Sequence, residues 1–379
     1  MIIRLGAMGD VVRTLPSLAA IRAAYPHAHI AWLVEEGAQG VLREHGDLDE
    51  VIRFPRVELT AALQKFQLRE VSRIFFQFVR ELRARKFDLV LDFHSIAKSG
   101  VLAFLSGAKQ RVGYAAPYGR EVSWLFSNHR VQVSSSASSS PSNSSKTSRY
   151  HRNQALVEYL GVDPCVEGQP LVASNAARSR VALAMGQKTS VILIHPGTSH
   201  GASYKRYPAQ NYGALARKLK GETGIECLVT RGVGSEERGL ADEIVAASNG
   251  AARLAPETNE LGDLVALIEA ARIFIGSDSG PLHIASLVGT PAVQILGPTN
   301  PVENTPRDGS EWERVHVPVA CSPCRRGCAQ ATCMKIIPHE LVAQAAVALL
   351  EKTKAQIERP TKPASAPAAR LVQAVQPWA

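Results

Sequence analysis

The sequence predicts an α/β protein with the GT-B arrangement, in which two Rossmann-like, doubly wound domains face a central cleft. Short apolar runs alternate with amphipathic segments through the first hundred residues, and the same alternation begins again at residue 190. Buried parallel strands appear in sequences as continuous apolar runs, and the helices between them make the crossover connections. A chain of 379 residues is also too long for one ordinary hydrophobic core.

The N-terminal half, residues 1–172, is predicted to form the first domain. Its apolar runs predict strands, and its amphipathic segments predict helices. Residues 134–148 read SSSASSSPSNSSKTS, a composition that cannot bury a core, so we expect a flexible surface loop there. The expected strands are 1–5, 29–34 and 87–93, and the expected helices are 11–24, 70–85 and 151–160.

A polar helical segment over 173–189 is predicted to connect this domain to a second one, residues 190–351. Pro, Ala and charged residues dominate 352–379, and we expect a poorly ordered tail there. In the second domain we expect strands at 190–195, 226–230, 273–276 and 292–296, and helices at 209–219, 236–247, 260–270 and 282–288.

The net charge of +9 favours an acidic partner, such as a phosphorylated substrate, an anionic membrane surface or nucleic acid. Between Arg53 and Arg130 the chain carries 14 Lys and Arg against 6 Asp and Glu, so most of the excess lies in one half. That concentration favours one anionic partner docking there, although a solvated basic face is an alternative. Without an apolar stretch of bilayer length or a signal-like N-terminus, we expect a cytoplasmic protein.

The first predicted strand runs into Gly6-Ala7-Met8-Gly9-Asp10. This turn lacks the G-x-G-x-x-G dinucleotide fingerprint, but its glycines still let a ligand approach backbone N–H groups at a helix start. Asp10 is expected to project into the cleft. The alternative is that Asp10 is an ordinary helix cap.

A polar loop follows the first strand of the second half and contains Thr198, Ser199, Lys205 and Arg206. Hydroxyls and amides bind phosphate oxygens, and adjacent cations neutralise the charge that grows on a diphosphate leaving group. The alternative is a pair of solvated cations before a helix.

A third loop, Gly276-Ser277-Asp278-Ser279-Gly280-Pro281-Leu282-His283, follows another apolar strand. Ser279 and Gly280 offer a hydroxyl and amides at a helix N-terminus, which is a second phosphate cradle. Asp278 is suited to accept hydrogen bonds from sugar hydroxyls, whereas His283 is equally well explained as a packed core residue.

Four cysteines, Cys321, Cys324, Cys328 and Cys333, follow the spacing C-x2-C-x3-C-x4-C. In a reducing compartment this cluster argues against a disulfide scaffold. It predicts a structural metal site or a thiol-stapled loop, with unligated thiols or a redox role as the alternatives.

Four segments together resemble glycosyltransferase family 9, the ADP-heptose:lipopolysaccharide heptosyltransferases: LGAMGDVVRTLPSL, IHPGT, GSDSGPLHIASLVGTPAVQILGPTNP and CSPCRRGC. The resemblance runs from about residue 1 to 350, except for the serine-rich segment. It implies that the N-terminal domain takes the acceptor and the C-terminal domain the nucleotide sugar. It also implies an inverting transferase that requires no metal or other cofactor.

The resemblance assigns roles to residues. Asp10 matches the general base, Lys205 the lysine that meets the donor phosphates, and Asp278 the acid that holds the heptose hydroxyls. The remaining donor-binding positions are Thr198, Ser199, Ser279, Gly280, His283 and Glu236, where the alignment can slip to Glu237. Basic positions expected to meet an anionic, lipid A-linked acceptor are Arg53, Arg56, Lys98 and Arg120. Contact with the cytoplasmic face of the inner membrane fits such an acceptor.

Two alternatives stay open. A related GT-B transferase would use UDP- or GDP-sugars for another surface glycan, because the loops do not identify the base. A nucleotide- or nucleic-acid-binding module would exploit the positive charge, but Asp10 and Asp278 would repel phosphate, and aromatic residues interleaved on a basic sheet are lacking. We therefore expect no nucleic-acid partner.

Overall fold

A computed structural model describes residues 1–133, 147–165, 169–186, 190–199, 201–232, 234–324 and 327–358, the side chains of 355–358 excepted. Of the predicted serine-rich loop, only Thr147 and Ser148 lie inside the described residues. Ser148 caps the helix that follows, because its side chain accepts a hydrogen bond from the backbone N–H of Tyr150.

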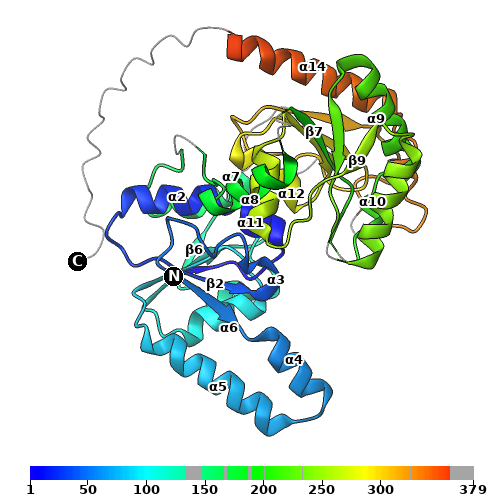
Figure 1. The fold of residues 1–379 in the computed structure, drawn as a ribbon. Coiled ribbons are helices and arrows are strands. Elements are labelled where there is room, and N and C mark those ends of the chain that lie inside the picture. The colour runs from blue at the N-terminus through cyan, green and yellow to red at the C-terminus, as the bar shows by residue number, and fades with distance from the viewer. Residues whose placement is uncertain are drawn as a thin grey trace.

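Two six-stranded sheets, both entirely parallel, form the framework of the molecule (Figure 1). The strands of the first sheet lie in the order β3-β2-β1-β4-β5-β6, and those of the second in the order β12-β11-β10-β7-β8-β9. Counted from its own first strand, each sheet has the Rossmann order 3-2-1-4-5-6. The first sheet comprises β1 (Ile2–Ile3), β2 (Ala31–Glu35), β3 (Glu50–Phe54), β4 (Leu89–Asp92), β5 (Gln110–Tyr114) and β6 (His129–Val131). The second comprises β7 (Val191–His195), β8 (Glu226–Val229), β9 (Ala252–Leu254), β10 (Ile273–Ser277), β11 (Ala292–Leu296) and β12 (Trp312–His316).

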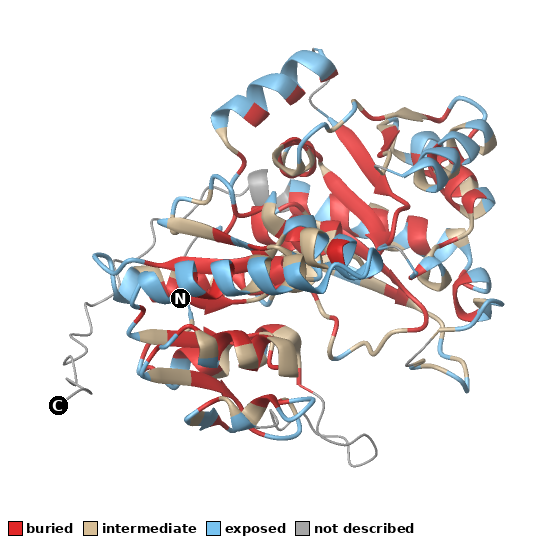
Figure 2. Cartoon of the chain, turned by 90° about the horizontal axis from the view of Figure 1, so that it is seen from below, coloured by how far each residue is buried: buried red, intermediate tan, exposed pale blue. Residues whose placement is uncertain are grey.

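Helices cover the faces of both sheets, as expected for βαβ crossovers. Figure 2 shows the consequence: the strands are largely buried, whereas the helices expose their outer faces. The helices are α1 (Met8–Val12), α2 (Leu15–Ala24), α3 (Glu36–Gln39), α4 (Arg56–Gln64), α5 (Leu68–Ala84), α6 (Ala97–Leu105), α7 (Arg149–Glu158), α8 (Asn175–Met185), α9 (Ala209–Thr223), α10 (Ser235–Ala247), α11 (Leu261–Glu269), α12 (Gly280–Val288), α13 (Thr332–Lys335) and α14 (His339–Glu358). Two short 3-10 turns lie at Ser123–Leu125 and Ser203–Lys205.

The apolar core explains why the central strands were visible in the sequence. Every residue of β7, β10 and β11 is buried, because helices cover both faces of the sheet at these strands. The short edge strands β6 and β9 have only three residues each, and they gave no apolar run that the sequence analysis could recognise.

The segment predicted as one helix over 11–24 is two helices, α1 and α2, and this prediction was wrong in that respect. Pro16 is the cause. In an unbroken helix the N–H of residue 16 would bond the carbonyl of residue 12, but proline has no N–H, and its ring would clash with that carbonyl. Thr14 at the break donates its hydroxyl hydrogen bond to the carbonyl of Asp10, with the two oxygen atoms 2.9 Å apart.

The tail predicted to begin at residue 352 is also corrected, because α14 continues to Glu358. Thr353 is buried, and its hydroxyl donates to the carbonyl of Leu349 at 2.9 Å. The Lys352 ammonium lies 2.5 Å from the Glu311 carboxylate. Within the described ranges, no helix has both the length and the apolarity needed to cross a bilayer.

The two halves meet where α1 packs against α12. A Cβ atom added at Gly9 would lie 3.2 Å from the Cα of Gly280, so the backbones of the two helix starts are in close contact. Because these glycines have no side chain, the first turn of each helix can lie against the other.

We predict that Gly9→Ala lowers the free energy of unfolding by about 1–2 kcal/mol, because the new methyl group presses on the Gly280 backbone rather than on a movable side chain. Gly239→Ala on α10 is the matched control, since its Cβ meets no atom within 4 Å and should be neutral or stabilising. Thermal unfolding of both variants measures the difference. Equal stability of the two would contradict the close contact.

Candidate active site

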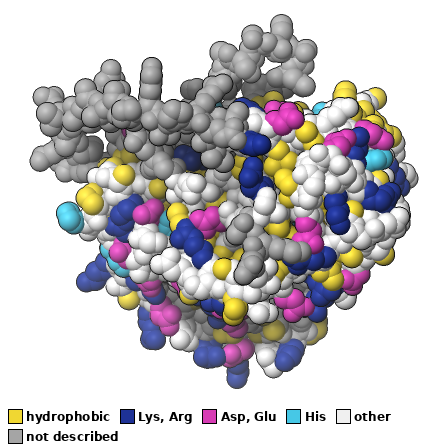
Figure 3. Space-filling model, turned by 45° about the horizontal axis from the view of Figure 1, so that its top comes forward, with side chains coloured by type: hydrophobic (Ala, Val, Ile, Leu, Met, Phe, Trp, Pro, Cys, Tyr) yellow, Lys and Arg dark blue, Asp and Glu magenta, His cyan; other side chains and the backbone are white. Residues whose placement is uncertain are grey.

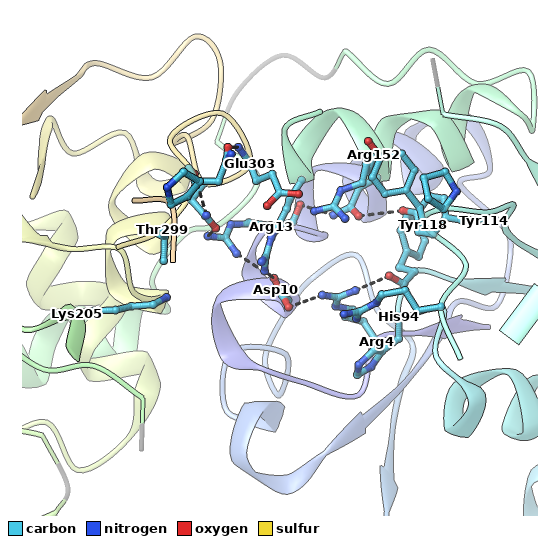
Figure 4. A pocket seen from close by; sticks show the side chains of 18 of the residues that line it. Arg4, Asp10, Arg13, His94, Tyr114, Tyr118, Arg152, Lys205, Thr299 and Glu303 are labelled. Carbon is cyan, nitrogen blue, oxygen red and sulfur yellow. Dashed lines mark hydrogen bonds and ion pairs between the residues drawn. The ribbon is translucent and has the colours of Figure 1, made fainter. Parts of the chain in front are cut away.

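Two cavities meet between the halves, beyond the carboxyl ends of the parallel strands. In doubly wound sheets, ligands bind beyond the carboxyl ends of the strands, at the point where the strand order reverses. In this chain the order reverses between β1 and β4 in the first sheet and between β7 and β10 in the second. The first, which we call the glycine-turn cavity, has a volume of about 690 Å³ and is lined by Gly9, Gly197 and Gly280 among others. The second, the arginine cavity, has a volume of about 770 Å³ and is lined by Arg4, Arg120 and Arg152 among others (Figure 4).

Asp10 lines both cavities. Its carboxylate is held by three guanidinium groups: Arg4 at 2.5 Å, Arg149 at 2.6 Å and Arg13 at 2.9 Å. Figure 4 shows Asp10 between Arg13 and Arg4 at the centre of this arrangement. The alternative that Asp10 is an ordinary helix cap does not hold, because α1 begins after Ala7 and has no side-chain cap.

Charge decides the ionisation of Asp10. Burial by itself would raise its pKa, but the cations Arg4, Arg149 and Arg13 outweigh burial and hold the pKa well below the ordinary value. The carboxylate is therefore ionised at neutral pH, and it is a weak base while all three arginines remain paired with it.

A second buried carboxylate, Asp278, lies across the boundary between the halves. It accepts ion pairs from Lys205 at 3.1 Å and from Arg13 at 3.3 Å. Burial opposes ionisation, but the charges of Lys205 and Arg13 hold the pKa of Asp278 well below its ordinary value. Arg13 thus links Asp10 of the first half to Asp278 of the second.

His283 does not line either cavity, and it is completely buried. Burial lowers its pKa to about 4, and the Arg13 charge acts in the same direction. The neutral ring accepts a hydrogen bond from Arg13 at Nε2, so its proton is on Nδ1, which faces the Tyr150 hydroxyl at 3.4 Å. His283 therefore fixes Arg13, which agrees with the packed-histidine alternative.

The N-terminus of α12 opens into the glycine-turn cavity beside Ser279 and Gly280. The first turn of a helix has unpaired N–H groups and a partial positive charge, and Ser279 makes no side-chain cap bond that would satisfy them. The Ser279 and Thr299 hydroxyls are buried and have no hydrogen-bond partner among the described residues. Such donors suit the oxygens of a phosphate group.

The other predicted donor-side residues also line the glycine-turn cavity, namely Thr198, Ser199, Lys205 and Glu236. Glu236 is mostly exposed and pairs with Arg206. Glu237 lines the same cavity and accepts a hydrogen bond from the Thr198 backbone N–H at 3.1 Å. Both glutamates are in reach of a ligand, so the choice between them remains a prediction.

The predicted acceptor-side residues divide into two groups. Arg120 lines the arginine cavity. Arg53, Arg56 and Lys98 line neither cavity, and each is paired with a glutamate. Arg56 and Lys98 both contact Glu35, and Arg53 contacts Glu58 at 2.5 Å.

A family model for glycosyltransferase family 9, described as heptosyltransferase, matches residues 75–334. The chain belongs to glycosyltransferase family 9.

Named relatives agree with this membership. The family 9 chain is 24% identical over 306 residues to the lipopolysaccharide core heptosyltransferase OpsX of Haemophilus influenzae, covering 80% of each chain. It is 23% identical over 301 residues to lipopolysaccharide heptosyltransferase 3 of Escherichia coli, covering 77% of this chain and 81% of that protein.

Solved structures confirm the GT-B fold. The E. coli ADP-heptose lps heptosyltransferase II matches with a TM-score of 0.69 at 20% identity, covering 93% of this chain and 98% of that one. E. coli heptosyltransferase WaaC with ADP-2-deoxy-2-fluoro heptose matches with a TM-score of 0.68 at 18% identity, with the same coverage.

Much of the arginine cavity of this family 9 transferase was not predicted from sequence. Arg4 lies within the first predicted strand region, whereas Arg149 and Arg152 follow the serine-rich segment. His94 was also missed: its Nδ1 accepts the Leu5 backbone N–H at 3.2 Å, which leaves Nε2–H as a donor at the cavity. No motif marked these residues. Arg4 and His94 do follow strands, β1 and β4, which is the position where ligand-binding residues are expected.

The four cysteines gather around one small cavity of about 40 Å³, together with Tyr204. All are free thiols, and no set of three or more Cys, His, Asp or Glu side chains arranged to hold a metal occurs among the residues that the structure describes. Cys333 is buried, and burial raises the pKa of its thiol, whereas Cys321 and Cys328 are exposed. The structure therefore brings the four cysteines together, and a structural metal or a thiol-stapled loop at this cluster stays a prediction.

We predict that His283→Gln changes how the stability of the enzyme depends on pH. A histidine whose pKa falls from 6.5 to about 4 on folding loses its stabilising effect as pH falls through that window, because the unfolded chain binds the proton first. Between pH 7.5 and pH 5 the wild type should lose about 2 kcal/mol more than the variant. Urea denaturation at both pH values measures this; parallel pH dependence would contradict a buried neutral imidazole.

Proposed function

We propose that this family 9 transferase moves a heptose from ADP-heptose to a hydroxyl of a lipopolysaccharide core acceptor, with inversion at the anomeric carbon. The observation that carries the proposal is that, among the described residues, Asp10 is the one carboxylate that lines both cavities. The names of the relatives support the choice of heptose and acceptor. The adenine nucleotide is supported by the relative solved with an ADP-heptose analogue.

The donor is proposed to occupy the glycine-turn cavity. Its diphosphate would lie against the N-terminus of α12, where the unpaired Ser279 and Thr299 hydroxyls and the Lys205 ammonium converge on one region. Asp278 would accept hydrogen bonds from the sugar hydroxyls, because Lys205 and Arg13 keep its carboxylate ionised. One of Glu236 and Glu237 would bind the ribose.

The acceptor is proposed to occupy the arginine cavity. Its hydroxyl oxygen would attack the anomeric carbon while Asp10 takes the hydroxyl proton. The bond between that carbon and the β-phosphate oxygen would break, and the electron pair would leave with ADP. Lys205 and the positive end of α12 would stabilise the charge that develops on ADP, so these cationic groups provide the charge stabilisation without a metal ion.

The arginines around Asp10 connect acceptor binding to this step. Arg4 and Arg149 line the arginine cavity, so an anionic acceptor would compete with Asp10 for their guanidinium groups. Sharing these cations would raise the pKa of Asp10 from its depressed value and strengthen the base when the acceptor is in place.

We predict that Asp10→Asn lowers kcat for heptose transfer by at least about a hundredfold, because amide nitrogen and oxygen cannot take the hydroxyl proton. The variant should still bind ADP, since the donor phosphates are proposed to contact Lys205 and α12 instead. Mass spectrometry of the glycosylated acceptor measures transfer, and a thermal shift with ADP is the control for folding. Transfer at the wild-type rate would exclude Asp10 as the base.

We predict that Arg120→Gln and Arg152→Gln each raise the acceptor KM about tenfold with little change in donor KM, through loss of a charge-assisted hydrogen bond. Arg152 is packed on the Tyr118 ring, 5.0 Å from its centre, and both residues line the arginine cavity. Arg56→Gln is the matched comparison, because Arg56 pairs with Glu35 outside the cavity. Steady-state kinetics at low salt decides: an equal effect of Arg56→Gln would place the acceptor elsewhere.

A further inference from the structure

Helices α4 and α5 form a hairpin that projects from the first domain, at the opposite end of the molecule from α14 (Figure 1). α4 buries only Ala62, and α5 buries only three residues of its C-terminal half, Phe78, Val79 and Leu82. The turn between the helices and the first half of α5 therefore have little contact with the rest of the protein.

This hairpin exposes several large apolar side chains. Phe66 in the turn is 89% exposed, Phe76 on α5 is 69% exposed, and Leu68 at the start of α5 is 67% exposed. Single exposed apolar residues are ordinary on protein surfaces, but several in one projecting element mark an interaction site. Leu63 and Val57 on α4 are also exposed.

Exposed arginines share the face of α5 that carries Phe76. Arg69, Arg73, Arg80 and Arg83 are exposed, and their spacing places them on the same side of α5 as Phe76. Between residues 56 and 86 the chain has eight Lys and Arg against three Asp and Glu. Arg69 and Arg80 make no ion pair with the described residues, whereas Arg73 pairs with Glu70 at 2.5 Å.

The face drawn in Figure 3 carries basic and acidic side chains interspersed with one another. The hairpin also leaves the sheet on the side where ligands bind, because α4 follows the carboxyl end of β3. The basic and apolar surface therefore belongs to the half that contains most of the arginine cavity.

We propose that the α4–α5 hairpin docks the enzyme on an anionic phospholipid bilayer. Phe66, Leu68 and Phe76 would enter the interface, and the arginines would meet headgroup phosphates, as in amphipathic helices that lie in the membrane plane. Exposed arginines mixed with aromatic side chains favour this occupant over an apolar protein surface. The proposal rests on the proposed function in one respect: a lipid-linked acceptor lies in a membrane, so the enzyme must reach the membrane surface to use it.

The test is co-sedimentation of the full chain with vesicles of phosphatidylcholine alone or mixed with phosphatidylglycerol. The wild type should bind only the mixed vesicles, and less strongly as salt increases. The double variants Phe66→Ser/Phe76→Ser and Arg69→Gln/Arg80→Gln should each lower the partition coefficient about tenfold or more. Leu183→Ser and Lys354→Gln are the matched controls, since both residues are exposed on other elements and should leave binding unchanged.

Several results would overturn the proposal. They are failure of the wild type to bind mixed vesicles, equal binding to phosphatidylcholine alone, or hairpin variants that bind like the wild type. A dimer in light scattering that the hairpin variants dissociate would instead assign the surface to a second copy of the chain. Transfer to a delipidated, water-soluble core acceptor separates the two proposals, because the hairpin variants should retain it whether or not docking occurs.

Discussion

The structure of the site depends on one electrostatic arrangement, in which the Asp10 carboxylate is shared among Arg4, Arg13 and Arg149. A carboxylate buried in this position would take up a proton if it had no cation beside it. Three guanidinium groups keep it ionised, and Arg13 extends the same network to Asp278 in the other half. Arg13 therefore joins the charged groups of the two domains into one network.

Backbone packing brings these charges within reach. Both sheets have the same strand order, so each has its ligand-binding edge beside its own first strand. Gly9 and Gly280 let the helix starts after β1 and β10 lie against each other. As a result Asp10, the proposed base, and the proposed diphosphate-binding turn share one boundary, with a cavity on each side. This geometry suits a transfer reaction, because donor and acceptor would bind in separate cavities that meet at Asp10.

Sequence patterns predicted the parts of this arrangement that local chemistry determines. Apolar runs gave the central strands, and the glycine-containing turns after them placed Asp10, Lys205 and Asp278 in one site. The sequence did not predict two of the partners of Asp10, because Arg4 and Arg149 reach it only through the tertiary fold. Arg13 is different: it follows Asp10 by three residues, a spacing that could have marked it as a local ion-pair partner. The sequence also did not reveal that Arg56 and Lys98 both pair with Glu35, and their contact with the acceptor stays a prediction. The residues next to an arginine in a basic sequence do not show whether it will pair with a glutamate of the same chain or with a ligand.

A crystal structure of the enzyme with ADP tests this arrangement of the two cavities. We expect the diphosphate in the glycine-turn cavity, with its oxygens within hydrogen-bond distance of Ser279, Lys205 and the first N–H groups of α12. Asp10 should face the arginine cavity beside it. A diphosphate bound among Arg4, Arg120 and Arg152 would contradict the assignment of the two cavities and the role of Asp10 with it.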